Sequence, residues 1–188
     1  MTVVLHAAPH GQGSSLVLRP WTDQDIPELI AAYRDPVMRQ WTRLHVTDEQ
    51  DARRWLEIQW KGWSEGHRLS FAVVEAEPEG GSRLVGNVAV KGLVAGGHHA
   101  DVGYWTARAA RGRGVAGRAL EALTAWAFER FAPQGLRRLR LLHLVDNLAS
   151  CRVAQKCGYA LDEIVPARPP FPGDGHVHVR HAPRRPLP

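Results

Sequence analysis

The stretch YWTARAARGRGVAGRALEAL, residues 104–123, decides the fold, because a β-rich run passes through a short turn directly into a helix. The small residues Gly112 and Gly114 let the backbone of this turn approach a ligand closely, and successive N–H groups can form a nest for an anion. The N-terminus of the helix adds roughly half a positive charge at the same point. The stretch therefore predicts a diphosphate site, although a Gly-x-Gly turn alone also fits a plain strand-to-helix connection.

Nucleotide-binding motifs of other kinds fit this stretch less well. The sequence has no Gly-x-x-x-x-Gly-Lys-Ser/Thr loop. A dinucleotide-binding fold would need a βαβ unit here, with an acidic residue about 20 positions further on, and neither feature is present.

Length and composition predict one soluble domain. The chain has 188 residues, of which 44% are hydrophobic and 23% charged, and its apolar runs are short. The first residues lack a basic segment followed by an apolar one, so we expect a cytoplasmic protein with no membrane partner. We expect a loose leader at 1–15, a single domain at 16–182 and a disordered tail at 183–188.

The formal charge of +5 comes mostly from arginine, since the chain has three lysines. Guanidinium groups fork onto phosphate oxygens, so this bias indicates a polyanionic partner, either a nucleic acid or a phosphorylated cofactor. The codon usage of a GC-rich genome explains the same bias without any ligand.

Hydrophobic periodicity outward from the central stretch predicts an α+β fold with a mixed, largely antiparallel sheet and about four helices. The expected helices cover residues 22–35, 47–65, 114–131 and 148–157. The expected strands cover residues 16–19, 69–76, 84–90, 100–106, 136–145, 159–165 and 176–181.

No metal site follows from the cysteines and histidines. Cys151 and Cys157 lie six residues apart in one expected helix and therefore on different faces, so neither a disulfide nor a metal site is indicated. His176, His178 and His181 belong to the last strand, where alternation places the first two on one face. Because no carboxylate or cysteine stands at ligand spacing, we expect these histidines to pack in the sheet and no metal to bind.

Three segments resemble the GNAT superfamily of acyltransferases. Its pyrophosphate-binding pattern, Arg/Gln-x-x-Gly-x-Gly/Ala, is matched by Arg111, Gly114 and Ala116. The run VDNLASCRVAQKCGY, residues 145–159, is similar to the Asn-x-x-Ser-x-x-x-Ala-x-x-x-Gly-Phe segment of the RimJ/RimL-like branch, with Tyr159 in place of Phe. The matching residues there are Asn147, Ser150, Ala154 and Gly158.

The opening LRPWTDQDIPELIAAYRDP, residues 18–36, resembles the first strand and helix of the same branch, and DVGYW, residues 101–105, resembles its central strand. The resemblance covers residues 16–165 in order. The final strand after Pro166 matches poorly, and it would form one edge of the substrate cleft.

The resemblance implies an acetyl-CoA-dependent N-acyltransferase with a GNAT fold, whose sheet is splayed between the strands at 100–106 and 136–145. The pantetheine arm of acetyl-CoA would insert between them. Cofactor contacts are implied for Tyr104, Trp105 and Thr106 along the arm, for Arg111, Gly112, Arg113, Gly114, Val115 and Ala116 at the pyrophosphate, and for Asn147 and Ser150.

Ser150 corresponds to the residue proposed in related enzymes to protonate the departing thiolate, and a first-turn serine could instead cap its helix. The acceptor would be a primary amine, on a protein N-terminus or a small molecule, and it would attack the thioester directly in a ternary complex. Only a neutral amine can attack, so a base is needed. Asp101 is the first candidate, since relatives often have Glu there. Glu75, His45 and water are the others.

Two other functions fit parts of the sequence. A non-catalytic CoA sensor would keep the phosphate loop and lose the chemistry. A nucleic-acid-binding module would explain the arginines, but these are scattered over several elements and no aromatic-and-basic recognition motif accompanies them. The identity of the acceptor, the acyl group beyond acetyl and the choice between monomer and homodimer stay open at the level of sequence.

Overall fold

One mixed sheet forms the centre of the molecule. The structure is a computed structural model that describes residues 3–9, 14–42, 44–77, 80–169 and 172–183. The strands lie in the order β1-β2-β3-β4-β5-β6-β8-β7. Their bounds are β1 Leu5–Ala7, β2 Leu16–Pro20, β3 Arg68–Ala76, β4 Ser82–Lys91, β5 His99–Thr106, β6 Arg138–Leu144, β7 Ala160–Val165 and β8 Gly175–His181. Among the strands of the described residues, only β5 and β6 pair in parallel, so the predicted α+β class with a largely antiparallel sheet is confirmed.

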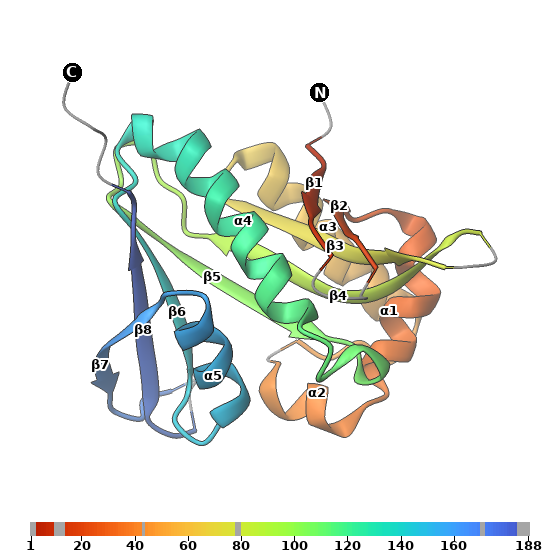
Figure 1. Cartoon of the computed structure of the whole chain (residues 1–188). Helices are drawn as coiled ribbons and strands as arrows, with labels where there is room; N and C mark the ends of the chain where they lie inside the picture. Colours follow the sequence, from red (N-terminus) through yellow and green to blue (C-terminus); the bar gives the residue numbers. More distant parts are fainter. Residues whose placement is uncertain (1–2, 10–13, 43, 78–79, 170–171, 184–188) are drawn as a thin grey trace.

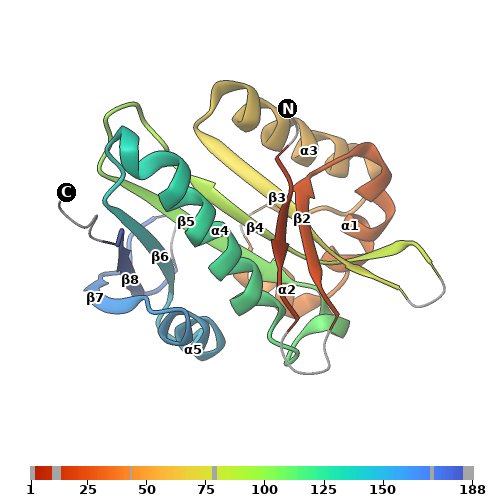
Figure 2. The ribbon, with the colours of Figure 1, turned by 45° about the horizontal axis from the view of Figure 1, so that its top comes forward.

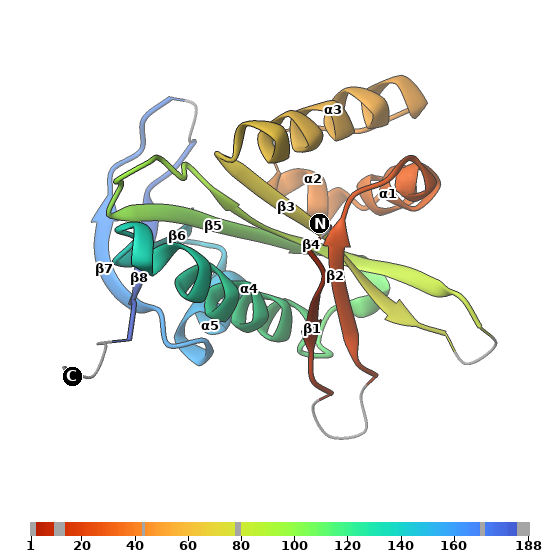
Figure 3. The same ribbon diagram turned by 90° about the horizontal axis from the view of Figure 1, so that it is seen from above.

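Helices cover both faces of the sheet. The α-helices are α1 Ile26–Tyr33, α2 Pro36–Trp41, α3 Glu49–Glu65, α4 Val115–Phe131 and α5 Leu148–Lys156. In the view from above, α1, α2 and α3 lie on one side of the sheet and α4 and α5 on the other (Figure 3). None of the helices in the described part of the chain is both long and apolar enough to cross a bilayer.

The described chain has five α-helices where the periodicity indicated about four, because an additional helix begins at Pro36, directly after the end of the first expected helix. Proline lacks an N–H and disfavours a helical conformation in the residue before it, but it fits the first position of a new helix. The Asp35 carboxylate caps that new helix by accepting a hydrogen bond from the Val37 N–H at 3.2 Å. The short helix α2 is the result.

Apolar side chains fill the space on both sides of the sheet. The core beneath α4 gathers Phe71, Leu120, Leu123 and Leu139, all fully buried. A second core lies beneath α1 and α3 and includes Trp55 and other apolar side chains. Strands β3 and β4 contribute to both cores, which explains why their sequences read as continuous apolar runs.

Part of the expected loose leader is a strand. Residues Leu5–Ala7 form β1, which pairs antiparallel with β2, and the side chain of Ala7 is buried. The stretch is too short and its alternation too brief to stand out in sequence. Of the expected disordered tail, 184–188 lies outside the described residues.

The sheet opens between β5 and β6. Their parallel pairing runs from His99 with Arg138 to Val102 with Leu141, and it stops there. Beyond that point β5 keeps its pairing with β4 up to Thr106, while β6 keeps its pairing with β8 through Leu144. The two strands diverge visibly in Figure 1, and Figure 2 shows α4 lying across the sheet beside the opening. The predicted splay is therefore confirmed.

Candidate active site

The turn before α4 presents free backbone donors. Gly112 and Gly114 both have positive φ angles, 74° and 73°, which glycine adopts without strain. Gly114 is the N-cap of α4. The Arg118 N–H donates the first hydrogen bond within the helix, to the Gly114 carbonyl at 3.1 Å. The N–H groups of 115–117 have no partner within the helix. They form, with the helix dipole, a place suited to an anion.

The side chains around this turn differ in what they can offer a ligand. Val115 is buried in the core beneath α4, so only its backbone N–H is available. Ala116, in the first turn of α4, is half-buried. Its small side chain leaves room for a bulky anion over the helix end.

Arg111 and Arg113 anchor the turn to both layers of the molecule. Arg111 Nη2 donates to Asp35 Oδ2, at the N-cap of α2. Arg113 Nη2 donates to Glu75 Oε1 on β3 at 2.6 Å. Both guanidinium groups, expected at the pyrophosphate, are thus engaged with carboxylates in this structure. The N–H groups at the start of α4 are the donors that this geometry leaves for an anion.

Residues 104–106 lie on the open edge of β5. Their strand pairs with β4 on one side, and the pairing with β6 ends at Val102 on the other. Tyr104 packs toward the core beneath α4, and Trp105 packs on the opposite face, its ring 6.0 Å from that of Trp21 and 6.2 Å from that of Tyr33. With these side chains turned into the two cores, the backbone edge is the part of this segment that a ligand could reach.

Asn147 and Ser150 form the first turn of α5. Asn147 is the N-cap, and its Oδ1 accepts a hydrogen bond from the Ser150 N–H at 3.1 Å. The capping function considered for the Ser150 side chain is therefore performed by Asn147. The Ser150 hydroxyl is not needed for capping.

Ser150 lies beside the phenol of Tyr104. Burial raises the pKa of Tyr104 to about 12, and the nearby Ser150 hydroxyl partly counteracts this effect. The buried Tyr104 Oη has no hydrogen bond of normal geometry among the described residues. The phenol thus stays protonated at neutral pH. A serine hydroxyl and a protonated phenol from α5 and β5 meet next to the opening in the sheet.

Asp101 occupies the last paired part of β5. It lies opposite Arg140 in the parallel register, and Arg140 Nε donates to Asp101 Oδ1 at 2.8 Å. Both side chains are partly exposed. The Asp101 carboxylate is therefore held one residue before the strand pairing ends, on the face opposite α4.

The other two candidate bases lie elsewhere. Glu75 is buried on β3, separated from β5 by β4, and the hydrogen bond from Arg113 is the main reason that its pKa is lowered. A carboxylate held in its charged form by two arginines serves to position the loop that carries Arg113. His45 is exposed between α2 and α3.

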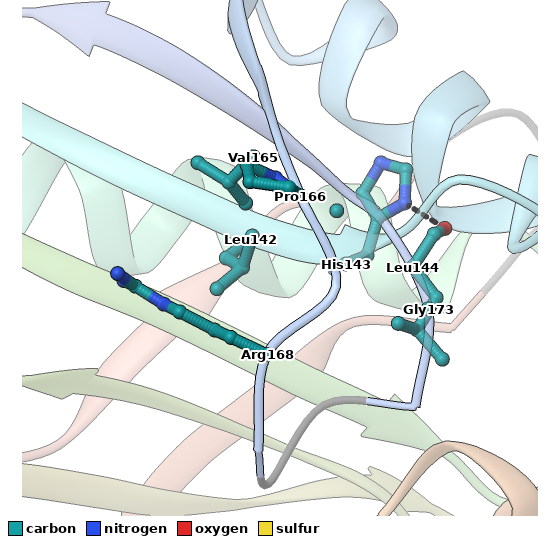
Figure 4. A pocket seen from close by; sticks show the side chains of 8 residues that line it. Leu142, His143, Leu144, Val165, Pro166, Arg168 and Gly173 are labelled. Atoms are coloured by element: carbon teal, nitrogen blue, oxygen red, sulfur yellow. Dashed lines mark hydrogen bonds between the residues drawn. The ribbon is translucent and has the colours of Figure 1, made fainter.

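A small pocket lies along β6 beyond the opening (Figure 4), lined by residues that include Leu142, Leu144, Val165 and Arg168. Part of its lining comes from the segment after Pro166, where the family resemblance is poorest. On the other side of β6, the structure gathers three histidines and Cys151, which the sequence pattern did not connect.

Comparisons with known proteins agree with this geometry. The family model described as "Acetyltransferase (GNAT) domain" matches residues 15–160. No curated protein sequence matches significantly. Among solved structures, a Vibrio cholerae protein provisionally described as a ribosomal-protein-serine acetyltransferase is 26% identical, with a TM-score of 0.76 over 88% of this chain and 93% of that one.

Two further structures share the fold at lower identity. RimL, a ribosomal α-N-protein acetyltransferase in complex with coenzyme A, is 19% identical, with a TM-score of 0.77 over 88% of this chain and 93% of that one. RimJ from Mycobacterium smegmatis, in complex with CoA-disulfide, is 19% identical, with a TM-score of 0.72 over 96% of this chain and 87% of that one.

Proposed function

Because the chain belongs to the GNAT acetyltransferase family, we propose that it transfers the acetyl group of acetyl-CoA to an α-amine, such as a protein N-terminus, or to another amine of lowered pKa. The observation that carries the proposal is the opening of the sheet after Val102, with the start of α4 and the Ser150 hydroxyl beside it.

The opening in the sheet suits two parts of acetyl-CoA, its diphosphate and its pantetheine arm. The diphosphate binds the N–H groups at the start of α4, where the helix dipole favours negative charge. The pantetheine arm lies along the open edge of β5 at 104–106. There its amide groups pair with the backbone groups of β5 that β6 no longer reaches. This places the thioester toward the paired end of the strands, near Asp101 and Ser150.

The reaction is a direct attack in a ternary complex. The neutral amine adds to the thioester carbonyl, the C–S bond breaks, and the acetyl group remains on nitrogen. Ser150 gives its hydroxyl proton to the departing sulfur, next to the protonated phenol of Tyr104. The nitrogen loses one proton, to Asp101 or to water, and a proton returned from solvent restores the Ser150 hydroxyl.

The acceptor class follows from proton arithmetic. An α-amine with a pKa of about 7.8 is roughly 10–15% neutral at pH 7, whereas a lysine with a pKa of about 10.4 is only about 0.04% neutral. The acidic candidate at the site, Asp101, already shares a salt bridge with Arg140. Without a strong base to deprotonate lysine, the α-amine is the better nucleophile. The ribosomal N-terminal acetyltransferases of the same fold support this choice.

The proposal predicts that a peptide with a free N-terminus is acetylated faster than a peptide of matched sequence whose N-terminus is blocked and whose only amine is a lysine. The rate is measured as CoA thiol released from acetyl-CoA between pH 6.5 and 9. We expect the advantage of the α-amine to be largest at pH 6.5 and to narrow as the pH rises, because the neutral fraction of lysine is still increasing when that of the α-amine saturates.

A lysine peptide that reacts faster over the whole range would contradict the acceptor assignment. Binding of acetyl-CoA without thiol release, for a panel of peptide and small-molecule amines, would instead identify a CoA sensor.

Ser150→Ala is expected to lower kcat by about 100-fold, the lower end of the range for loss of a general acid, while the dissociation constant of acetyl-CoA changes by less than about 3-fold. The proton is needed only as the thioester breaks, so the loss falls on the transition state. Ser150→Thr, which keeps a hydroxyl, is the matched control and should retain more activity than Ser150→Ala. An unchanged kcat, or an equal loss in acetyl-CoA affinity, would assign Ser150 to cofactor binding alone.

A further inference from the structure

Three histidines and a cysteine converge on the face of the sheet that α5 covers. They are His143 on β6, His176 and His178 on β8, and Cys151 on α5, here called the His–Cys cluster. Each side chain offers one nitrogen or sulfur atom, and these four atoms all lie within 4.8 Å of one another. The cluster is separate from the base and acid proposed above, and the inference drawn from it does not depend on the proposed function.

Strand register brings the histidines together. His143 and His176 are directly opposed in the antiparallel pairing of β6 with β8, and His178 lies two residues further along the same face. The ring centroids are 5.2–6.0 Å apart. The first turns of α5 then place Cys151 above the strands, with its Sγ 3.7 Å from His178 Nε2.

Two of the rings are already oriented as metal ligands usually are. His143 Nδ1 lies 2.8 Å from the Leu144 carbonyl (Figure 4), and His178 Nδ1 lies 3.2 Å from the Tyr159 carbonyl. A carbonyl oxygen only accepts, so Nδ1 carries the proton in each ring and Nε2 keeps the lone pair. A hydrogen bond from the second ring nitrogen to a carbonyl is the usual companion of histidine ligation.

Packing alone leaves this cluster unsatisfied. His143 is buried, and its Nε2 has no hydrogen-bond partner among the described residues; the same holds for the buried His176 Nδ1. A buried polar atom without a partner costs free energy, and natural proteins rarely retain one without a reason. Here the two unpaired nitrogens belong to the same group of converging side chains as Cys151 Sγ, which indicates a common ligand.

We propose that the His–Cys cluster binds one Zn²⁺ ion through His143, His176, His178 and Cys151. Tetrahedral zinc with nitrogen and sulfur ligands implies separations of about 3.3–3.8 Å between ligand atoms. The Cys151 to His178 distance is already in that range, and the remaining atoms, all within 4.8 Å of one another, need to approach by about 1.5 Å or less, within reach of side-chain rotations. Imidazole and thiolate donors disfavour Mg²⁺ and Ca²⁺, which prefer oxygen.

Four protein ligands leave no open position on zinc, so this is a structural site rather than a catalytic one. The Cys151 thiol releases its proton to solvent when it binds the metal as a thiolate. The bound ion would join α5 to β6 and β8 and hold the helical turn that carries Ser150 and Cys151. The sequence argument against a metal failed to connect these residues because the cysteine comes from a helix 27 positions before His178, not from the strand itself.

The test is a Co²⁺ titration of the reduced full chain prepared without a histidine tag, followed by competition with Zn²⁺. We expect one Co²⁺ per chain, visible absorption bands of tetrahedral cobalt, a near-ultraviolet thiolate-to-cobalt band, and displacement by Zn²⁺ with loss of all these bands. About one proton should be released per ion bound. Failure of both ions to bind at one equivalent per chain would overturn the proposal.

The variants Cys151→Ser and His176→Gln test the ligands separately. Cys151→Ser should abolish the thiolate band, and each variant should weaken binding by at least about 100-fold, since loss of a supporting residue alone costs about 10- to 100-fold. The controls are Cys157→Ala, whose thiol contacts the Gly117 carbonyl at 3.5 Å, and His181→Gln, an exposed histidine on the same strand. They should bind within about 3-fold of the parent. Equal affinities in the ligand variants and the controls would mean adventitious binding at other side chains and would refute the site.

Discussion

Ala116→Glu is expected to weaken acetyl-CoA binding by about 100- to 1,000-fold. The new carboxylate would lie in the first turn of α4, over the proposed diphosphate site. Two like charges about 4 Å apart repel by roughly 4 kcal/mol at an effective dielectric constant near 20, and about 1.4 kcal/mol corresponds to a tenfold change in affinity. Isothermal titration calorimetry with acetyl-CoA measures the loss.

The matched control is Ala116→Gln, which has the same size without the charge and should lose much less affinity. Glutamate is favoured in the first turn of a helix, so the melting temperature of the ligand-free Ala116→Glu variant should not fall. This position is a better test than Gly114, whose φ of 73° would strain any larger residue. Equal affinities for the two Ala116 variants would place the diphosphate elsewhere.

Tyr159→Ala is expected to reduce the free energy of unfolding by about 3–5 kcal/mol, the range for large-to-small changes of aromatic residues in a core. Tyr159 is fully buried beneath α4, and its hydroxyl lies 2.6 Å from Thr124 Oγ1. Removal leaves a cavity and an unpaired Thr124 hydroxyl. Since domains of this size are stable by about 5–15 kcal/mol, urea unfolding should show a large shift of the midpoint.

Tyr159→Phe separates the two causes, because it keeps the ring and removes only the hydroxyl. It should cost about 1–3 kcal/mol, the penalty of leaving the buried Thr124 hydroxyl without a partner. The double variant Tyr159→Phe with Thr124→Val should recover part of that loss. If Tyr159→Ala and Tyr159→Phe unfold at the same urea concentration, the ring contributes little and the packing argument is wrong.

Local patterns were sufficient for most of the fold. Leu120, Leu123 and Ala127 repeat at helical spacing and are all buried on α4, and Gly158 ends α5 with the expected positive φ of 69°. Errors occurred where the signal was short or ambiguous. The three residues of β1 are too few to show alternation, and Pro36 ends one helix while starting the next.

For the candidate site, the sequence predicted segments that the structure places around the opening between β5 and β6, but not the contacts that each side chain makes. The turn at 111–116 could be recognised because glycines, small residues and a helix start are consecutive in the chain. Arg111 and its partner Asp35 are separated by 76 positions in the chain, and Arg113 and its partner Glu75 by 38 positions. No local pattern carries such pairs, so the anchoring of the turn by its arginines could be seen only in the structure.

The sequence by itself determined the family, the α+β class and the strand-to-helix turn at which we propose that a diphosphate binds, because each depends on residues that are neighbours in the chain and impose their backbone conformation locally. Tertiary structure alone decided which side chains meet. The pairing of β6 with β8 aligned His143 with His176, and the packing of α5 on these strands brought Cys151 to His178. Such contacts depend on strand register and helix packing. Both are set by the burial of apolar surface across the whole chain, so no single segment of the sequence carries a pattern for them.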